Sequence, residues 1–170
     1  MEDVSKLKVL LSESEARQKE LQSRLEDLED FIENASLPLH WVNGSGIVIW
    51  VNKAELDLLG YSKEEYIGKH ISNFHADKHI IEDILDRLVK KETLRNYFAK
   101  LKCRNGEIKP VLLNSNVRWD GEKFLHTRCF TRDITDLKLA EQRNINLIND
   151  LQDKCSLLKS ENEALKKHLS

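Results

Sequence analysis

The sequence predicts an α+β protein, in which a five-stranded antiparallel sheet carries short helices on one face and a long helix extends from each end. Alternating runs joined by short Gly-containing turns indicate the sheet. All six glycines, both prolines and every aromatic residue except Phe31 lie between positions 38 and 130. The flanks, 1–34 and 135–170, lack Gly and Pro and are rich in Leu, Glu, Lys, Gln and Asn, as long helices are. We therefore expect coiled-coil helices over both flanks and one compact domain at 35–134.

Composition excludes several classes of protein. The 170 residues carry a net charge of −2, so no large basic field is available for nucleic acid or an anionic membrane. The longest apolar run is Ile47 to Val51, which predicts no membrane insertion and no signal peptide. Cys103, Cys129 and Cys155 are too far apart for a disulfide framework or a zinc ribbon. Unpaired cysteines fit a cytoplasmic location.

The first flank contains a heptad repeat. Apolar residues alternate at spacings of three and four over about four heptads, although Ser14 and Gln18 interrupt the middle. A helix of this length is roughly 50 Å long, too long to be covered by a small domain. The residues expected to pair with a second chain are Leu7, Leu11, Leu21, Leu25, Leu28 and Ile32. The alternative is a helix that folds back on its own domain.

The second flank has a clearer repeat. Its predicted interface consists of Ile148, Leu151, Cys155, Leu158, Asn162, Leu165 and Leu169. Leucine at successive d positions with one Asn at an a position favours a parallel two-stranded coiled coil. This predicts a homodimer. Residues 136–146 contain no dense run of Lys and Arg, which excludes a basic zipper that binds DNA.

The segment before this zipper has two competing apolar stripes. In the zipper register Glu141 and Asn144 occupy core positions, where they pack poorly. A second stripe with the same spacing turns the seam toward Ala140 and Leu147. Neither packing is strong, so we expect a segment that can switch between the two.

The compact domain begins with a predicted hairpin. Strands are expected over 37–42 and 47–51, because the turn residues 44–46 separate two β-rich runs. A short helix is expected over 54–59, ending at Gly60.

Capping signals predict two further helices. Ser62 and Glu65 form a capping box that opens a short helical turn ending at Gly68. Asp77 is placed to cap a longer helix. Its predicted apolar face consists of Ile80, Ile81, Ile84, Leu85 and Leu88.

A three-stranded meander is predicted to follow. Alternation of period two indicates strands over 94–104, 107–119 and 122–133. Asn105-Gly106 and Asp120-Gly121 lie between them, and each is typical of a two-residue hairpin turn.

The order and residues of these elements resemble a PAS domain of the bacterial sensor type, the sensory-box domain associated with histidine kinases. The resemblance covers about 30–136, and its matching segments are Asp30–Ala35, Ile47–Asn52, Ala54–Tyr61, Glu65–Gly68, the Asn105-Gly106 turn and Phe130–Thr135. In such domains an Asp-Ile-Thr junction ends the sheet and opens a signalling helix. The resemblance therefore implies a signal junction at Asp133, Ile134 and Thr135.

Two functions remain open at this point. The resemblance implies a cytoplasmic, dimeric sensory or regulatory module that detects a small ligand or partner and transmits its state through the C-terminal coiled coil. It also implies two-component-type signalling, with a kinase as a possible partner. The alternative is a ligand-free dimerisation adaptor. We find neither a phosphate-binding Gly-x4-Gly-Lys loop nor a His-Glu-x2-His pair, and we do not expect an enzyme.

A pocket is expected between the sheet and the helices, as the resemblance implies. Its candidate residues are Trp41, Phe74, His75, His79, Ile80, Ile84, Trp119, His126 and Cys129, with His40 on the same strand as Trp41. The alternative is that the aromatic residues belong to the core and that Cys103 and Cys129 are small buried apolar side chains.

The cofactor, if any, is not identified by the sequence. His79 falls roughly where haem-binding relatives carry their axial ligand, but Ile80 follows instead of the Asp of their His-Asp signature. The alternative is a surface or capping histidine pair, His75 and His79, and no further ligands for zinc are evident. Flavin relatives need an adduct-forming Cys near 73–76, where none occurs, so we do not expect a flavin adduct.

Overall fold

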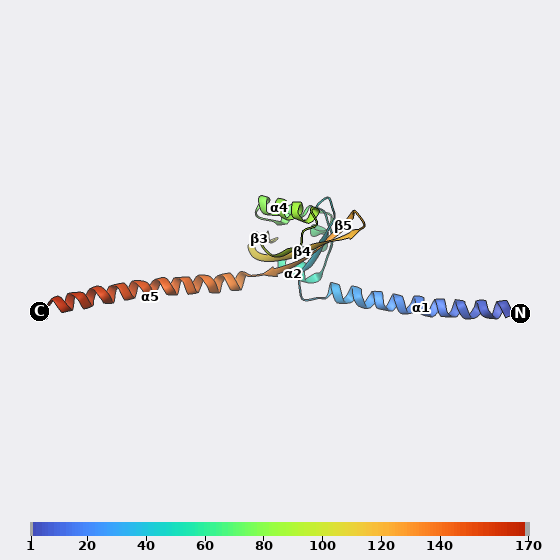
Figure 1. Ribbon diagram of the computed structural model, residues 1–170, viewed down its shortest axis with the longest axis horizontal. Helices are drawn as coiled ribbons and strands as arrows, with labels where there is room; N and C mark the ends of the chain where they lie inside the picture. The colour runs from blue at the N-terminus through green and yellow to red at the C-terminus, as the bar shows by residue number, and fades with distance from the viewer. Residues whose placement is uncertain (1, 169–170) are drawn as a thin grey trace.

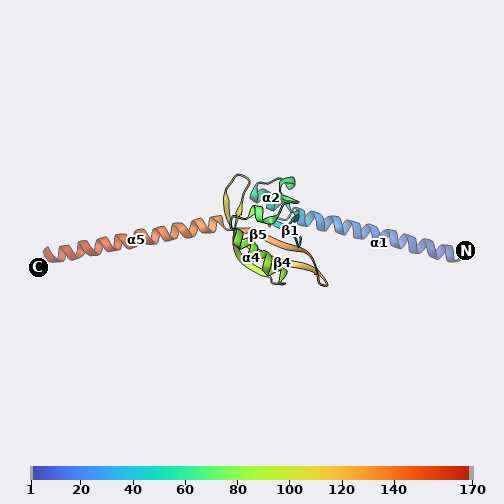
Figure 2. The same cartoon turned by 90° about the horizontal axis from the view of Figure 1, so that it is seen from above.

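The computed structural model describes residues 2–168, with the side chains of residues 6–164. It confirms the predicted α+β class. α1 (Glu2–Glu33) and α5 (Thr135–His168) extend in opposite directions from a small domain, as two perpendicular views agree (Figures 1 and 2). None of the helices in the described part of the chain is long and apolar enough to span a membrane.

The sheet contains five antiparallel strands in the order β2-β1-β5-β4-β3. The strands are β1 (Leu39–Val42), β2 (Val48–Val51), β3 (Leu94–Lys102), β4 (Ile108–Asp120) and β5 (Lys123–Asp133). The first and last strands are neighbours, with Leu39 opposite Phe130 and His40 opposite Cys129. The chain therefore enters and leaves the sheet through paired strands.

Short helices cover one face of the sheet. They are α2 (Lys53–Leu59), α3 (Lys63–Tyr66), the 3₁₀ helix η1 (Ile71–Phe74) and α4 (Lys78–Val89). The structure confirms the Ser62–Glu65 capping box and the end of α2 at Gly60, which adopts φ 76°. η1 was not predicted. Asp77 occupies the N-cap position of α4, but its side chain makes no capping hydrogen bond.

Both turns of the meander differ from the prediction. In the first, Cys103 N donates to Glu107 O at 2.8 Å and Gly106 N donates to Cys103 O at 3.0 Å. The loop therefore contains three residues and places only its glycine, φ 88°, in the left-handed region. In the second, Asp120 pairs with Lys123, so the turn lies one residue later than expected.

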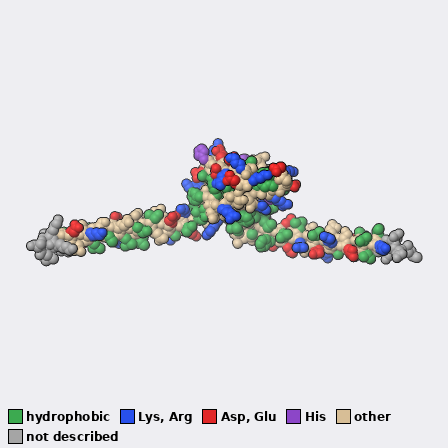
Figure 3. Space-filling model, in the orientation of Figure 1, with side chains coloured by type: hydrophobic (Ala, Val, Ile, Leu, Met, Phe, Trp, Pro, Cys, Tyr) green, Lys and Arg blue, Asp and Glu red, His purple; other side chains and the backbone are tan. Residues whose placement is uncertain are grey.

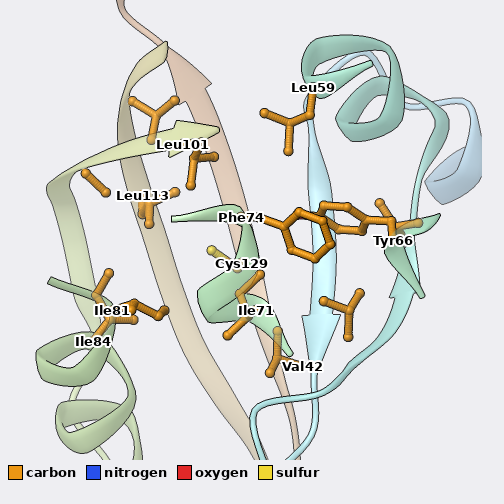
Figure 4. Packing of buried hydrophobic residues seen from close by; sticks show 14 of the residues in the cluster. Val42, Leu59, Tyr66, Ile71, Phe74, Ile81, Ile84, Leu101, Leu113 and Cys129 are labelled. Atoms are coloured by element: carbon orange, nitrogen blue, oxygen red, sulfur yellow. The ribbon is translucent and has the colours of Figure 1, made fainter. Parts of the chain in front are cut away.

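The core lies between the sheet and the helices (Figure 4). Ile81, Ile84 and Leu88 of α4 are buried as predicted, whereas Ile80 and Leu85 are partly buried around them. Each fully buried aliphatic side chain of this kind stabilises the fold by about 1.5–3 kcal/mol.

Both long helices leave their apolar positions open to solvent. Leu7, Leu11, Leu21, Leu25 and Leu28 are exposed on α1, while Ile32 is half-buried beside the domain. On α5 the exposed members of the predicted interface are Ile148, Leu151, Cys155, Leu158 and Asn162. The side chain of Leu165 and the whole of Leu169 lie outside the described residues.

The solvent-exposed apolar rows are not covered by the chain's own domain. Figure 3 shows hydrophobic side chains along both helices and where each helix meets the domain. α1 extends away from the domain instead of folding back on it (Figure 1). Pairing of these faces with a second chain stays a prediction.

Candidate functional site

A small cavity of about 20 Å³ lies between the sheet and the helices. Its floor is a row of three inward-facing side chains on adjacent strands, with Cys129 directly opposite His40 on one side and Ser115 on the other. The remaining walls are formed by Val42, Ile71, His75, Ile81, Ile84, Leu85, Leu88, Leu113 and Thr127. The site is therefore an apolar chamber with a polar floor.

Two polar atoms at this cavity have no protein partner. His75 Nδ1 and Ser115 Oγ make no hydrogen bond with any residue that the structure describes, although the two residues are only 4% and 3% exposed. A cavity needs about 10–15 Å³ to hold one water molecule. The chamber lined by these two residues therefore has room for one water-sized molecule.

A buried carboxylate organises the residues next to the chamber. Glu55 is fully buried, and its Oε1 accepts hydrogen bonds from Tyr66 Oη and Thr131 Oγ1, both at 3.2 Å. His40 Nδ1 lies 2.9 Å from the same oxygen. Glu55 Oε2 has no partner among the described residues. The carboxylate thus connects α2, α3, β1 and β5 at a single point.

The two histidines at the chamber have opposite electrostatic environments. Burial opposes the charged form of His40, but the neighbouring Cys129 and the Glu55 carboxylate outweigh it and raise the pKa of His40 to about 10. Burial, with the nearby charges of His40 and Lys102, lowers the pKa of His75 to about 3. At neutral pH His40 is therefore an imidazolium paired with a carboxylate, and His75 is a neutral imidazole.

Asn52 attaches the N-terminal helix to this network. Its Oδ1 accepts hydrogen bonds from the backbone N–H groups of Leu39, at 2.9 Å, and Glu55, at 3.1 Å, so that it also caps α2. Its Nδ2 lies 2.9–3.4 Å from three carbonyl oxygens, that of Ile32 in the last turn of α1 and those of Ala35 and Leu37 in the segment that follows it. One buried side chain therefore joins the end of α1, the start of β1 and the start of α2.

The predicted signal junction is a compact hydrogen-bonded corner. Asp133 Oδ1 accepts hydrogen bonds from Thr135 N, at 2.8 Å, and Thr135 Oγ1, at 2.5 Å, while Oδ2 lies 3.2 Å from Lys109 Nζ. Ile134 is buried, and its N–H donates to Pro110 O at 3.0 Å. Strand β5 is therefore joined to α5 without a flexible linker.

Some predicted pocket residues lie where the sequence placed them. His75, Ile84 and Cys129 line the chamber, as does the further candidate His40. Phe74 is buried in the surrounding core, where its ring lies 4.2 Å from that of Tyr66. Ile80 packs around the core without lining the chamber.

Four predicted pocket residues lie elsewhere. Trp41 and His126 stack on each other on the opposite face of the sheet, with ring centroids 4.4 Å apart. Side chains alternate along a strand, so inward-facing His40 and Thr127 place these neighbours outward. Trp119 instead packs against Phe124 and beneath Lys91 Nζ.

His79 is the fourth misplaced residue. Its side chain is 98% exposed on α4, and its nearest charged partner is Glu82 at 4.0 Å. The predicted axial-ligand position therefore points to solvent, away from the interior of the domain. The surface interpretation of this histidine agrees with its position.

The outward-facing aromatic residues border a groove. Trp41 and Trp50, with ring centroids 4.8 Å apart, form its floor between the sheet and the end of α1. The groove has a volume of about 570 Å³, and its other walls are Ile32 and the polar residues Glu26, Glu29, Asp30, Glu33 and Asn34. This groove is much larger than the internal chamber.

Sequence reasoning missed several polar members of the site. Ser115 and Thr127 occupy inward positions among apolar residues on their strands, so a polar residue within the alternation was the available signal. Glu55 follows three residues after the N-cap Asn52, a spacing at which a capping role is the ordinary expectation. Its burial followed from no local pattern.

Comparison with known proteins gives a family and a group of relatives. A family model described as a PAS domain matches residues 35–136. Phytochrome B of Sorghum bicolor is 31% identical over 140 residues, which cover 77% of this chain but only 12% of that protein. The chain therefore spans a small part of the length of this relative.

Solved structures show the same fold. The PAS domain of an HTR-like protein from Haloarcula marismortui has a TM-score of 0.62 at 21% identity, covering 71% of this chain and 99% of that one. A domain of a sensory box sensor histidine kinase/response regulator from Geobacter sulfurreducens has a TM-score of 0.57 at 23% identity, covering 66% and 96%. At these identities the likeness concerns the fold alone.

Proposed function

Because the chain belongs to the PAS domain family, whose members are sensory and non-catalytic modules, we propose that it is a dimeric sensor that reports the state of its core through α5. The signal is a small ligand or a partner protein. The proposed setting is cytoplasmic two-component-type signalling, with a kinase as the partner. The domains of sensor histidine kinases that share this fold support that setting.

The observation that carries the proposal is the continuity of β5. The strand places Cys129 at the chamber and Thr131 on Glu55, then reaches the Asp133–Thr135 corner. A change in the chamber that shifts β5 therefore moves the first turn of α5. Ile134, buried against the sheet, keeps that turn attached to the domain.

The exposed apolar rows of the long helices support a dimer. Leu151 and Leu158 are 52% and 62% exposed in the single chain, and a parallel coiled coil would bury both. Between the domain and this zipper lie the two competing stripes, which include Ala140 and Leu147 or Glu141 and Ile148. We propose that the state of the domain selects between these packings.

Disulfide cross-linking tests this transmission. Single cysteines are introduced at positions 140, 141, 147 and 148 of a Cys155→Ser chain, with and without Asp133→Ala. Removing the Asp133 carboxylate deletes its bonds to Thr135 and Lys109, so the ratio of cross-linking at 140 and 147 to that at 141 and 148 is expected to change.

Asp136→Ala is the matched control. Asp136 lies in the first turn of α5 and is exposed, so its removal is expected to leave the cross-linking ratio unchanged. Circular dichroism verifies that each variant is folded. An identical pattern with and without Asp133 would contradict transmission through the corner.

A ligand-free adaptor is the second candidate function. The small chamber favours it, since about 20 Å³ excludes a metabolite-sized ligand from the core as folded. Native mass spectrometry and the absorption spectrum of purified protein separate the two functions. A bound molecule supports sensing, and its consistent absence, together with an unchanging coiled-coil pattern, supports the adaptor.

A further inference from the structure

We propose that Cys129 is a redox-reactive thiol and that the chamber above it binds hydrogen peroxide, which converts the thiol to a sulfenic acid. The inference deepens the proposed sensory function, on which its signalling role rests. It concerns the chamber at the centre of the core, where Figure 4 shows Cys129 among the buried side chains.

The first observation is an ordered row of thiol, imidazole and carboxylate. Cys129 and His40 are directly opposite on paired antiparallel strands, an arrangement that places Cβ atoms about 4.5–5.5 Å apart. Both side chains face the chamber. On its far side His40 Nδ1 lies 2.9 Å from Glu55 Oε1. The carboxylate orients the ring and keeps it protonated, as in cysteine sites that use an imidazole as their acid or base.

The second observation is independent and points to a ligand. His75 Nδ1 and Ser115 Oγ are buried at the same chamber without a hydrogen-bond partner among the described residues. An unsatisfied buried polar group costs about 1–3 kcal/mol. A small molecule with both O–H donors and lone pairs satisfies the two groups together, since Ser115 can donate and neutral His75 can accept.

The size of the chamber limits the occupant. A volume of about 20 Å³ exceeds the roughly 10–15 Å³ that one water needs, so the occupant is at most slightly larger than water. Hydrogen peroxide has two oxygens and the required donors and acceptors. Organic hydroperoxides with bulky substituents do not fit.

The reaction balances with groups already present. The Cys129 thiolate attacks one peroxide oxygen, so that an S–O bond forms while the O–O bond breaks. The sulfur is oxidised by two electrons, and the peroxide is reduced to hydroxide. The imidazolium of His40 donates its proton to this hydroxide, which leaves as water. The products are a sulfenic acid at Cys129, one water molecule and neutral His40.

The product would change the packing of the strand that leads to α5. The added oxygen occupies the space between Cys129, Ser115 and His75. Oxidation also removes the charge of the Cys129 thiolate, which favours the imidazolium of His40 beside Glu55, and Glu55 also holds Thr131 of β5. Oxidation therefore acts on two positions of the strand that ends at Asp133.

The other cysteines are internal controls. Cys103 is also buried, but its thiol lies 4.0 Å from the Leu58 carbonyl oxygen, and burial raises the pKa of Cys103, which disfavours the reactive thiolate. Cys155 is exposed on α5. The three thiols thus compare a buried site opposite an imidazole, a buried site beside a carbonyl oxygen and an open site in one chain.

The test treats the full chain with hydrogen peroxide, traps sulfenic acid with dimedone and measures each cysteine by peptide mass spectrometry. We expect the thiol of Cys129 to be oxidised at least about tenfold faster than that of Cys103. His40→Asn is expected to slow the oxidation of Cys129 at least about tenfold, because a positioned proton donor contributes about 10²–10⁴-fold to a rate. His126→Asn, on the outer face of the sheet, is the matched control and is expected to change nothing.

Two further arms keep the test independent of the folding of one variant. Ser115→Ala removes only a hydroxyl and is expected to slow Cys129. Cumene hydroperoxide is expected to modify exposed Cys155 and to spare Cys129. The proposal is overturned if hydrogen peroxide modifies Cys155 but not Cys129, if folded His40→Asn and Ser115→Ala both react normally, or if the bulky oxidant reaches Cys129 equally well.

Peroxide treatment of the cross-linking variants separates this inference from the proposed function. Oxidised Cys129 with an unchanged coiled-coil cross-linking pattern supports the reactive thiol and contradicts its transmission. An inert Cys129 in a chain whose coiled coil still responds to Asp133→Ala overturns the reactive thiol and leaves the sensory function standing.

Discussion

The pKa values of the two buried histidines at the chamber are shifted in opposite directions. His75 has no anionic partner, so burial favours its neutral form and lowers its pKa to about 3. His40 is buried as well, but Cys129 and Glu55 favour its charged form and raise its pKa to about 10. The surroundings of each ring, and not burial alone, therefore determine its charge.

These shifts predict a maximum of stability near pH 6.5. Below the unfolded-state pKa of about 6.5, the unfolded chain protonates His75 while the folded chain does not, so stability falls as the pH is lowered. The contribution of His40 to the free energy of unfolding is fully present below about pH 6.5 and is lost as the pH rises toward about 10. Urea unfolding between pH 5 and 9 measures the loss of stability on each side of this maximum.

The variant for this prediction is His75→Asn. It is expected to remove up to about 1.4 kcal/mol per pH unit from the slope on the acid side, the value for one proton. His79→Asn is the control, because that side chain is 98% exposed and is expected to leave the slope unchanged. If stability still falls with the same slope below pH 6.5 in His75→Asn, groups other than His75 cause that fall.

Asn52 has two structural roles, and a pair of variants can distinguish them. Asn52→Ala removes both the cap of α2 and the bonds to the segment after α1, and is expected to destabilise the domain by about 0.5–2 kcal/mol for the cap alone. Asn52→Asp keeps the accepting oxygen but loses the donors to Leu37 and Ala35.

Hydrogen exchange measures the difference. With Asn52→Asp we expect amides of residues 32–37 to exchange faster while those of α2 stay protected. With Asn52→Ala both segments are expected to exchange faster. Equal protection of residues 32–37 in Asn52→Asp and the unchanged protein would contradict the role assigned to the amide nitrogen.

At the scale of elements, local signals predicted most of the fold. The Ser62–Glu65 box and the αL glycine Gly60 depend on residues only a few positions apart, so the sequence contains them in full. The turn after Cys103 was misjudged because Asn-Gly fits both a two-residue loop and a three-residue loop with a bulge. The choice depends on strand register, which longer pairings determine.

The face of each strand was harder to predict than its existence. Alternation shows that Trp41 and His40 point to opposite sides, but it does not show which side receives the helices. An aromatic residue suggests the core, yet Trp41 is half-buried in the groove below α1 and His40 faces the chamber. Likewise, His79 has a ligand-like spacing from His75 although α4 turns it outward.

At the scale of the whole molecule, the important contacts join distant parts of the sequence. His40 meets Cys129 because β1 pairs with β5, and Thr131 meets Glu55 across 76 positions. No local period encodes these pairings, so the chamber could be named only as an expected space between layers. The resemblance to a family supplied the topology that single residues could not.

The open helices predict the state of the whole molecule in solution. We expect a parallel dimer at tens of micromolar, with the two Cys155 residues close enough for mild oxidation to link the chains. Leu151→Glu places charges in the seam and is expected to shift the protein toward monomer, whereas Ser156→Glu, outside the predicted seam, is not. Sedimentation velocity and non-reducing electrophoresis measure both, and a monomeric unmodified chain would contradict the prediction.

A force that pulls the two long helices apart would act on the sheet at one end of the β1–β5 pair. α1 leads to the start of β1 and α5 leaves the end of β5, and antiparallel pairing places these ends together. Once the bonds from Asn52 to Ile32, Ala35 and Leu37 have broken, tension along the directions in Figure 1 loads the bond from Thr131 N to Pro38 O, then the Leu39–Phe130 pair, then His40 and Cys129. Bonds in this arrangement break one after another and do not share the force. The β1–β5 pair thus separates one bond at a time, and the third step parts His40 from Cys129 at the floor of the chamber.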